Sequence, residues 1–371
     1  MREGVERRIR ILAVAGARPN FMKIAPLLRE LRTREGVEAF LVHTGQHYDA
    51  AMSESFFEEL GIAPPDANLG VGSGSHAAMT AEVLRRIEPI LEEQRPDALL
   101  VVGDVNSTIA ASLAAVKLGV PVAHVEAGLR SFDRGMPEEI NRVLTDAISQ
   151  WLFVTEPSGE ENLRREGVQA ERIHFVGNVM IDTLLAHLER ARKRDTLDRL
   201  GLEREGYGVL TLHRPSNVDD PGQLQGLFQV LEDIHEEIPV VFPVHPRTQA
   251  AIQRGLSGRR PRLMLTEPLG YLDFLRLMAD ARLVLTDSGG IQEETTVLGV
   301  PCLTLRENTE RPVTVSQGTN RVVGTDPATI RAEARKILAG DVKRGATPER
   351  WDGRAAERIA DVLVRDLGET A

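Results

Sequence analysis

Short apolar runs alternate with longer amphipathic stretches along the chain. Runs rich in Val, Ile and Leu predict two series of strands: first at 9–15, 39–43, 98–102, 121–126, 151–155 and 173–176, then at 208–212, 240–244, 262–266, 282–286, 302–305 and 321–323. The stretches between them, such as 77–94 and 224–237, have the apolar spacing of helices. Apolar strands that alternate with helices are typical of parallel sheets covered on both faces.

Two series of strands predict an α/β protein with two doubly wound, Rossmann-like domains. We place the first domain at residues 1–180 and the second at 181–350, with a charged helical segment at 186–205 leading into the second half. The helical pattern at 354–367 predicts that residues 351–371 form a C-terminal helix, which we expect to pack back on the first domain.

Polar clusters follow many of the predicted strands. They occupy positions 16–19, 43–47, 103–104, 126–128, 213–214, 245–247, 267–268 and 287–290. Ligands of open parallel sheets bind beyond the carboxyl ends of the strands. Clusters in both halves therefore predict one cleft between two facing domains, and this arrangement resembles that of the GT-B glycosyltransferase superfamily.

The stretch 286–294 has a sequence typical of an anion site. An apolar run leads into Ser288, Gly289 and Gly290, and a helical pattern follows. A glycine turn at a helix start presents backbone N–H groups and the positive end of the helix dipole to an anion. Glu294 lies about one turn further on, within reach of a ribose, so the motif predicts a nucleotide. The alternative is an ordinary Ser-Gly turn that caps a structural helix.

The composition is typical of a globular protein and disfavours two classes of binding partner. The chain has 371 residues, 42% hydrophobic and 27% charged, with a net charge of −10. This charge disfavours binding to nucleic acid or to an anionic membrane. Cys302 is the single cysteine and is expected to be a buried thiol. The charged N-terminus and the absence of a long apolar stretch predict a cytoplasmic protein.

Several motifs, in order along the chain, resemble those of the non-hydrolysing UDP-N-acetylglucosamine 2-epimerases. They cover positions 16–23, 103–108, 124–130, 136–142, 213–214, 287–294 and 309–312. Each motif alone is modest evidence, whereas the ordered set, spanning about 9–326, is specific.

The resemblance implies inversion at C2 of the sugar. Departure of UDP from C1 makes the C2 hydrogen acidic, elimination gives a 2-acetamidoglucal, and UDP adds back after protonation from the other face. Such a site needs carboxylates, for which the resemblance implies Asp104, Glu126 and Glu138. Asp104 could instead cap the helix that begins near Asn106, and Glu138 could merely complement a helix dipole.

The resemblance also implies a set of UDP contacts. Its members are basic or imidazole side chains near the phosphates (Arg18, Lys23, His213 and Arg311), the diphosphate turn (Ser288, Gly289 and Gly290), Glu294 at the ribose and Phe274 near uracil. His213 is also expected to assist departure of UDP. Lys23 could instead be a solvated helix residue, Phe274 a core residue and His213 a satisfied loop histidine or helix cap.

Neither a metal nor a nicotinamide cofactor is implied. The histidines show no His-Glu-x-x-His spacing and the dinucleotide fingerprint is absent. By resemblance we expect a homodimer that binds UDP-N-acetylglucosamine, with Gln46 and His245 as positions of a possible allosteric site. The alternatives are a related epimerase of UDP-2,3-diacetamido-glucuronate, a UDP-sugar glycosyltransferase, and a nucleotide-sugar-binding regulator without catalysis.

Overall fold

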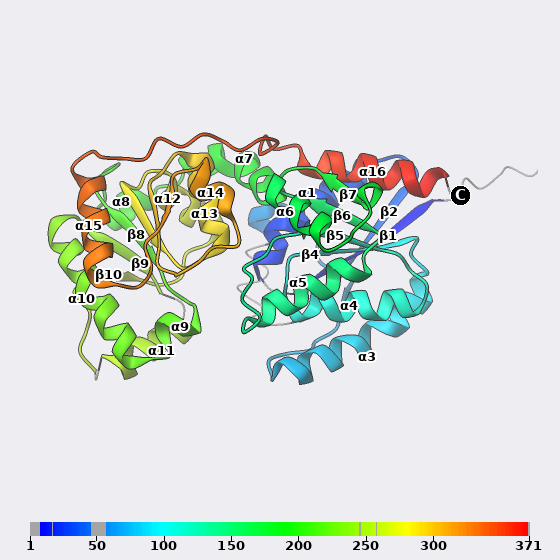
Figure 1. Cartoon of the computed structure of the whole chain (residues 1–371), viewed down its shortest axis with the longest axis horizontal. Helices are drawn as coiled ribbons and strands as arrows, with labels where there is room; N and C mark the ends of the chain where they lie inside the picture. Colours follow the sequence, from blue (N-terminus) through cyan, green and yellow to red (C-terminus); the bar gives the residue numbers. More distant parts are fainter. Residues whose placement is uncertain (1–7, 17, 46–56, 245, 257, 370–371) are drawn as a thin grey trace, which may run out of the picture. The chain divides into compact units, whose positions relative to one another are not determined.

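Two parallel sheets organise the protein in the computed structural model, which describes residues 8–16, 18–45, 57–244, 246–256 and 258–369 (Figure 1). The chain divides into two compact units: Met1–Thr183 together with Glu349–Ala371 form unit 1, and Leu184–Pro348 form unit 2. The expected pair of doubly wound α/β folds is confirmed.

Unit 1 contains a seven-stranded sheet with the order β3-β2-β1-β4-β5-β6-β7. Its strands are β1 (Ile9–Ala15), β2 (Val37–His43), β3 (Ala67–Asn68), β4 (Ala98–Val102), β5 (Val122–Ala127), β6 (Trp151–Val154) and β7 (Ile173–Phe175). Every pairing is parallel. The strand order reverses between β1 and β4, and such a switch point is where ligands of this fold bind.

The helices of unit 1 cover this sheet. They are α1 (Arg18–Thr33), α3 (His76–Gln94), α4 (Asn106–Lys117), α5 (Pro137–Ile148), α6 (Pro157–Arg165), the short 3₁₀ helix η1 (Ala170–Arg172) and α16 (Ala355–Glu369). Apolar residues of α3 and α4 form one core cluster with β1, β2 and β4. All five residues of β4 are buried, because helices cover both faces of a parallel sheet.

Unit 2 repeats the plan with the strand order β10-β9-β8-β11-β12-β13. Its strands are β8 (Gly208–Thr211), β9 (Val240–Pro243), β10 (Met264–Thr266), β11 (Leu283–Thr286), β12 (Cys302–Thr304) and β13 (Asn320–Val322). Its helices are α8 (Thr196–Leu200), α9 (Pro215–Val218), α10 (Pro221–Glu237), α11 (Pro246–Gly255), α12 (Tyr271–Ala279), α13 (Gly289–Leu298), α14 (Pro312–Ser316) and α15 (Pro327–Leu338). The order reverses between β8 and β11.

The strands predicted from the sequence are all confirmed, with shifts of a few residues at their ends. Strand β3 was not predicted because its two residues carry no periodic pattern. The prediction of a single helical segment at 186–205 is wrong. Helix α7 (Val179–Arg192) ends earlier, and α8 is a separate helix that Gly201 terminates in a left-handed conformation. None of the described helices is both long and apolar enough to cross a membrane.

The last segment of the chain returns to unit 1. Helix α16 packs against α1 and β1, and Asp182 of α7 accepts hydrogen bonds from the backbone N–H groups of Ala355 (3.1 Å) and Ala356 (2.7 Å). These N–H groups open α16 and have no partner within the helix. Burial raises the pKa of Asp182 to about 6, against the opposing effect of these two hydrogen bonds.

We predict that Asp182→Ala weakens the attachment of α16, because two buried N–H groups lose their acceptor. The free energy of unfolding of unit 1 should fall by about 1–2 kcal/mol in urea titrations. Asp182→Asn keeps one side-chain acceptor and should lose less. Equal stability of Asp182→Ala and the unmodified protein would show that α16 is held by its apolar face alone.

Candidate functional site

Glu126 occupies a strained position at the end of β5. Its φ is +70°, a left-handed conformation that side chains rarely adopt, and the pairing of β5 with β6 shifts register here. Its carboxylate is buried and lies 2.5 Å from the Lys23 ammonium of α1. Oε2 makes this contact, while Oε1 is buried without a hydrogen bond among the described residues. Strain of this kind, held by surrounding contacts, is common at functional sites.

Gly103 makes room for this ion pair. It follows β4 with a φ of +68°, and a Cβ added there would lie 3.3 Å from Lys23 Nζ and 3.4 Å from Glu126 Oε2. Glycine therefore serves both the backbone conformation and the approach of the pair. The alternative that Lys23 is a solvated helix residue is wrong, since only 8% of it is exposed.

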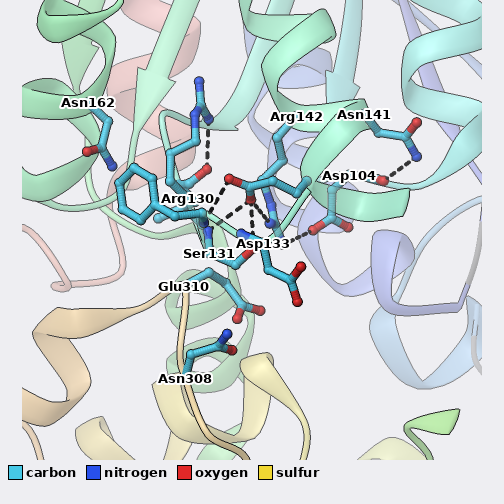
Figure 2. A network of polar contacts seen from close by, with 12 residues as sticks. Asp104, Arg130, Ser131, Asp133, Asn141, Arg142, Asn162, Asn308 and Glu310 are labelled. Carbon is cyan, nitrogen blue, oxygen red and sulfur yellow. Dashed lines mark hydrogen bonds and ion pairs between the residues drawn. The ribbon is translucent and has the colours of Figure 1, made fainter. Parts of the chain in front are cut away.

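Asp104 follows directly, and its side chain remains 23% exposed. Its carboxylate lies 2.5 Å from Arg142 Nη2, and its main-chain oxygen accepts a hydrogen bond of 2.8 Å from Asn141. Figure 2 shows both α5 side chains reaching toward Asp104. The N-cap residue of α4 is Val105 rather than Asp104.

Glu139, which the sequence did not single out, is the buried acid of this part of α5. It pairs with Arg142 at 2.8 Å and accepts hydrogen bonds from the backbone N–H groups of Ser131 and Phe132. The predicted Glu138 lies beside it in the first turn, partly exposed, and makes no hydrogen bond or ion pair within the described part of the chain. Nothing in the sequence pattern distinguishes the two acids, since both sit in the first helical turn.

Asp146 forms a second buried cluster around β5. It contacts His124 Nδ1 (2.6 Å), the backbone N–H of Gly128 (3.0 Å) and Arg130 Nη2 (2.7 Å). Burial would raise the pKa of Asp146, but His124 and Arg130 outweigh it and hold the pKa below its ordinary value. Arg130 also binds Glu166, at 2.6 Å. These contacts fix the backbone on both sides of Glu126.

In unit 2, Asp287 and His213 meet across the switch point between β8 and β11. Asp287 is fully buried, lies 2.9 Å from His213 Nδ1, and accepts hydrogen bonds from the backbone N–H groups of His213 and Arg214. Burial acts to raise the pKa of Asp287. The contacts with His213 and with these N–H groups lower it by more, so the pKa of Asp287 is below its ordinary value. The His213 side chain is 56% exposed, so its other face is open to a ligand.

The predicted anion turn opens helix α13. Ser288 is the N-cap residue of this helix and makes no side-chain capping bond. A Cβ on Gly289 would lie 2.4 Å from Arg311 Nη1, so the glycine lets a guanidinium reach the first turn. Arg311 in turn contacts Glu293 and Glu310, each at 2.7 Å. Gly290 is the second residue of the helix.

Glu294 lies in the same helix and is buried. Tyr271 OH donates to it at 3.3 Å. Burial raises the pKa of Glu294 to about 8, the Tyr271 hydrogen bond opposes this, and the charge of Glu293 adds to it. Burial also raises the pKa of Tyr271. A carboxyl kept neutral near pH 7 can donate as well as accept hydrogen bonds, which suits a hydroxyl-rich ligand.

The remaining predicted positions are less informative. Phe274 is partly buried on α12. Arg18 opens α1, but its side chain is outside the described part, as are Gln46 and His245. The structure thus brings Lys23 and Glu126 together in unit 1, beside Gly103, the residue before Asp104, and Gly289 and Arg311 together in unit 2. Nowhere in the described ranges do three His, Cys, Asp or Glu side chains converge as a metal site would require.

Two doubly wound units, each with polar side chains at its switch point, are typical of a GT-B-like fold. A model of the UDP-N-acetylglucosamine 2-epimerase family matches residues 29–364. The UDP-N-acetylglucosamine 2-epimerase of Methanococcus maripaludis is 44% identical over 94% of this chain and 97% of its own. The UDP-2,3-diacetamido-2,3-dideoxy-D-glucuronate 2-epimerase of Pseudomonas aeruginosa is 41% identical over 96% of this chain and 100% of its own.

A solved structure agrees with this assignment. The Methanocaldococcus jannaschii UDP-GlcNAc 2-epimerase, in complex with UDP-GlcNAc and UDP, is 40% identical, with a TM-score of 0.89 over 96% of this chain and 100% of that one. This chain belongs to the UDP-N-acetylglucosamine 2-epimerase family. It is therefore an isomerase.

The raised pKa of Glu294 predicts a pH-dependent stability. The unfolded chain ionises this group near its ordinary value of 4.5, the folded protein only near 8. Stability is therefore fully present below about 4.5 and is lost as pH rises through 8, by an amount on the order of a few kcal/mol. Urea unfolding from pH 5 to 9 should show this decline, and Glu294→Gln should flatten it. Parallel curves for the two proteins would contradict the assignment.

The buried Lys23–Glu126 pair predicts an asymmetric response to mutation. Lys23→Met leaves the Glu126 carboxylate buried without its counter-charge and should cost about 3–5 kcal/mol of unfolding free energy. The double variant Lys23→Met, Glu126→Gln should recover most of this loss in the same urea titrations. A cost of less than about 1 kcal/mol for Lys23→Met would show that water reaches the carboxylate.

Proposed function

We propose that the protein interconverts UDP-N-acetylglucosamine and UDP-N-acetylmannosamine. One observation carries the proposal: at the switch point of an epimerase-family fold, the buried Glu126 carboxylate lies beside Gly103, the residue before Asp104. One of its oxygens contacts Lys23, and the other has no hydrogen bond among the described residues. Relatives at 40–44% identity bear the name of this activity.

The reaction proposed is elimination followed by re-addition. The C1–O bond breaks, its electron pair leaves with UDP, and a carboxylate takes the C2 proton as the C1–C2 double bond of 2-acetamidoglucal forms. A second acid then protonates C2 from the opposite face, and the UDP oxygen adds back to C1. Asp104, Glu126 and Glu138 are the proposed acids and bases.

Unit 2 is the proposed holder of UDP. The first turn of α13, at Ser288, Gly289 and Gly290, offers N–H groups to the diphosphate, and Arg311 adds positive charge beside Gly289. We assign Glu294 to the ribose, Phe274 to the region of the uracil, and the exposed face of His213 to the departing diphosphate. Arg18 remains a proposed phosphate contact. For Lys23 the contact with Glu126 favours the carboxylate over the phosphate as its partner.

A second substrate is favoured by one observation. The P. aeruginosa relative named for UDP-2,3-diacetamido-2,3-dideoxy-D-glucuronate is 41% identical, close to the values of the relatives named for UDP-N-acetylglucosamine. Both substrates undergo inversion at C2, so the same carboxylates serve either. Turnover with each compound in parallel decides between them.

We further propose a cytoplasmic homodimer that serves cell-wall polysaccharide synthesis, with Gln46 and His245 as positions of a regulatory substrate copy. These proposals rest on the resemblance of the sequence motifs. Light scattering tests the dimer, and a substrate-dependent rise in the rate of the reverse reaction tests the regulation.

The proposal predicts a signature in deuterated water. Proton NMR of the pure enzyme with UDP-N-acetylglucosamine should show a manno product with deuterium at C2 and UDP still attached. Asp104→Asn and Glu126→Gln should each reduce turnover by about 10²–10⁴-fold, with UDP affinity by calorimetry unchanged because unit 2 is intact. Wild-type turnover in either variant would remove that carboxylate from the mechanism. Free N-acetylmannosamine would indicate hydrolysis instead.

A further inference from the structure

His124 and Asp146 are not among the proposed acids and bases, yet they contact the backbone segments that carry Asp104 and Glu126. Asp146 reaches two points of the chain that are equidistant from Glu126 in sequence: the imidazole of His124, two residues before, and the N–H of Gly128, two residues after. Both contacts are buried. The left-handed turn at Glu126 is therefore held at both of its ends by one carboxylate.

The second nitrogen of His124 contacts the other catalytic segment. Nε2 lies 2.9 Å from the carbonyl oxygen of Gly103, the residue before Asp104. The N–H of Gly103 in turn donates to the carbonyl of Val125, at 3.0 Å. Both polar groups of Gly103 are thus bound to β5, so the turn that carries Asp104 is fixed against the strand that carries Glu126.

These contacts determine the protonation of the ring. A carbonyl oxygen can only accept a hydrogen bond, so Nε2 donates. Asp146 accepts a hydrogen bond from the Gly128 N–H and lies 2.7 Å from Arg130 Nη2, contacts that suit an ionised carboxylate, so Nδ1 donates to it as well. An imidazole that donates from both nitrogens is an imidazolium. The buried cluster then contains two cations, His124 and Arg130, and two anions, Asp146 and Glu166.

We propose that His124 is a positioning residue: as a buried imidazolium on Asp146, it fixes the Gly103 carbonyl and thereby the placement of Asp104 relative to Glu126. The expected effect on kcat rests on the proposed function. The charge of the imidazole ring does not, because it can be measured without substrate. A misplacement of a catalytic group by about 1 Å can cost about 10²-fold in rate, so a loss of the Gly103 contact affects kcat.

The charge of the ring is tested first, without substrate. In protein with ¹⁵N-labelled histidine at pH 7.5, the signal that disappears in His124→Gln belongs to His124. We expect that signal to show two ring N–H protons and two protonated nitrogens. A single ring proton, with the other nitrogen unprotonated, overturns the proposal.

Two matched variants then separate the two hydrogen bonds. The side-chain amide nitrogen of His124→Gln can take the place of Nε2 and donate to Gly103, whereas that of His124→Asn takes the place of Nδ1 and donates to Asp146. We expect His124→Asn to lower kcat by about 10–100-fold and His124→Gln to lower it clearly less, with KM and UDP affinity unchanged in both. Equal kcat values in the two variants, or a loss expressed in KM, overturn the positioning role.

A failure of the proposed function and a failure of the positioning role give different results. If the wild-type enzyme leaves both candidate UDP-sugars unchanged, the proposed function fails, and the ring protons still decide the charge of His124. If the wild-type enzyme turns over and the variants behave alike, the function stands and the positioning role is wrong. Retained UDP affinity and an unchanged circular dichroism spectrum serve as controls for folding.

Discussion

The end of β5 is the constraint on which the rest of unit 1 depends. Glu126 is both left-handed in its backbone and buried in its side chain, and each property has a cost of about 1–3 kcal/mol or more. Lys23 offsets the burial and Asp146 holds the backbone. Gly103 suits its place because its φ of +68° disfavours a side chain and a Cβ there would crowd the ion pair. The elements β1–α1, β4, β5 and α5 are thus joined by polar contacts at one edge of the sheet.

The buried acids Asp146 and Glu294 show how the partners of a carboxyl group set its pKa. Asp146 lies against Arg130 and His124, and its pKa is held below the ordinary value. Among the described residues, Glu294 has the hydroxyl of Tyr271 as its hydrogen-bond partner, and burial raises its pKa to about 8. Near pH 7 the Asp146 carboxylate therefore only accepts hydrogen bonds, whereas the Glu294 carboxyl can also donate one to a hydroxyl group.

The sequence predicted the strands, the doubly wound folds and the strand-end positions of Asp104, Glu126, His213 and Asp287, because burial and turn chemistry leave local patterns. It did not predict the contacts that give these residues their character. Arg142 reaches Asp104 over 38 residues of chain, and Lys23 reaches Glu126 over 103. Nothing local identifies such partners, and nothing local separates the buried Glu139 from its neighbour Glu138. The prediction of one helix at 186–205 was wrong because the charge content of a segment does not show where a helix ends.

An aspartate occupies the same position of the fold in both units, and its surroundings differ between the two. In each sheet the strand across the switch point from the first strand is followed by an aspartate: Asp104 after β4 and Asp287 after β11. Asp287 is fully buried, and backbone N–H groups of the neighbouring turn bind its oxygens, so it anchors that turn and orients His213. Asp104 is 23% exposed and pairs with an arginine from α5. The same place in the fold therefore holds a structural anchor in unit 2 and an accessible carboxylate in unit 1. Both oxygens of Asp287 are occupied by these contacts, whereas the Asp104 carboxylate is partly exposed, and this difference supports the proposal of proton transfer at Asp104.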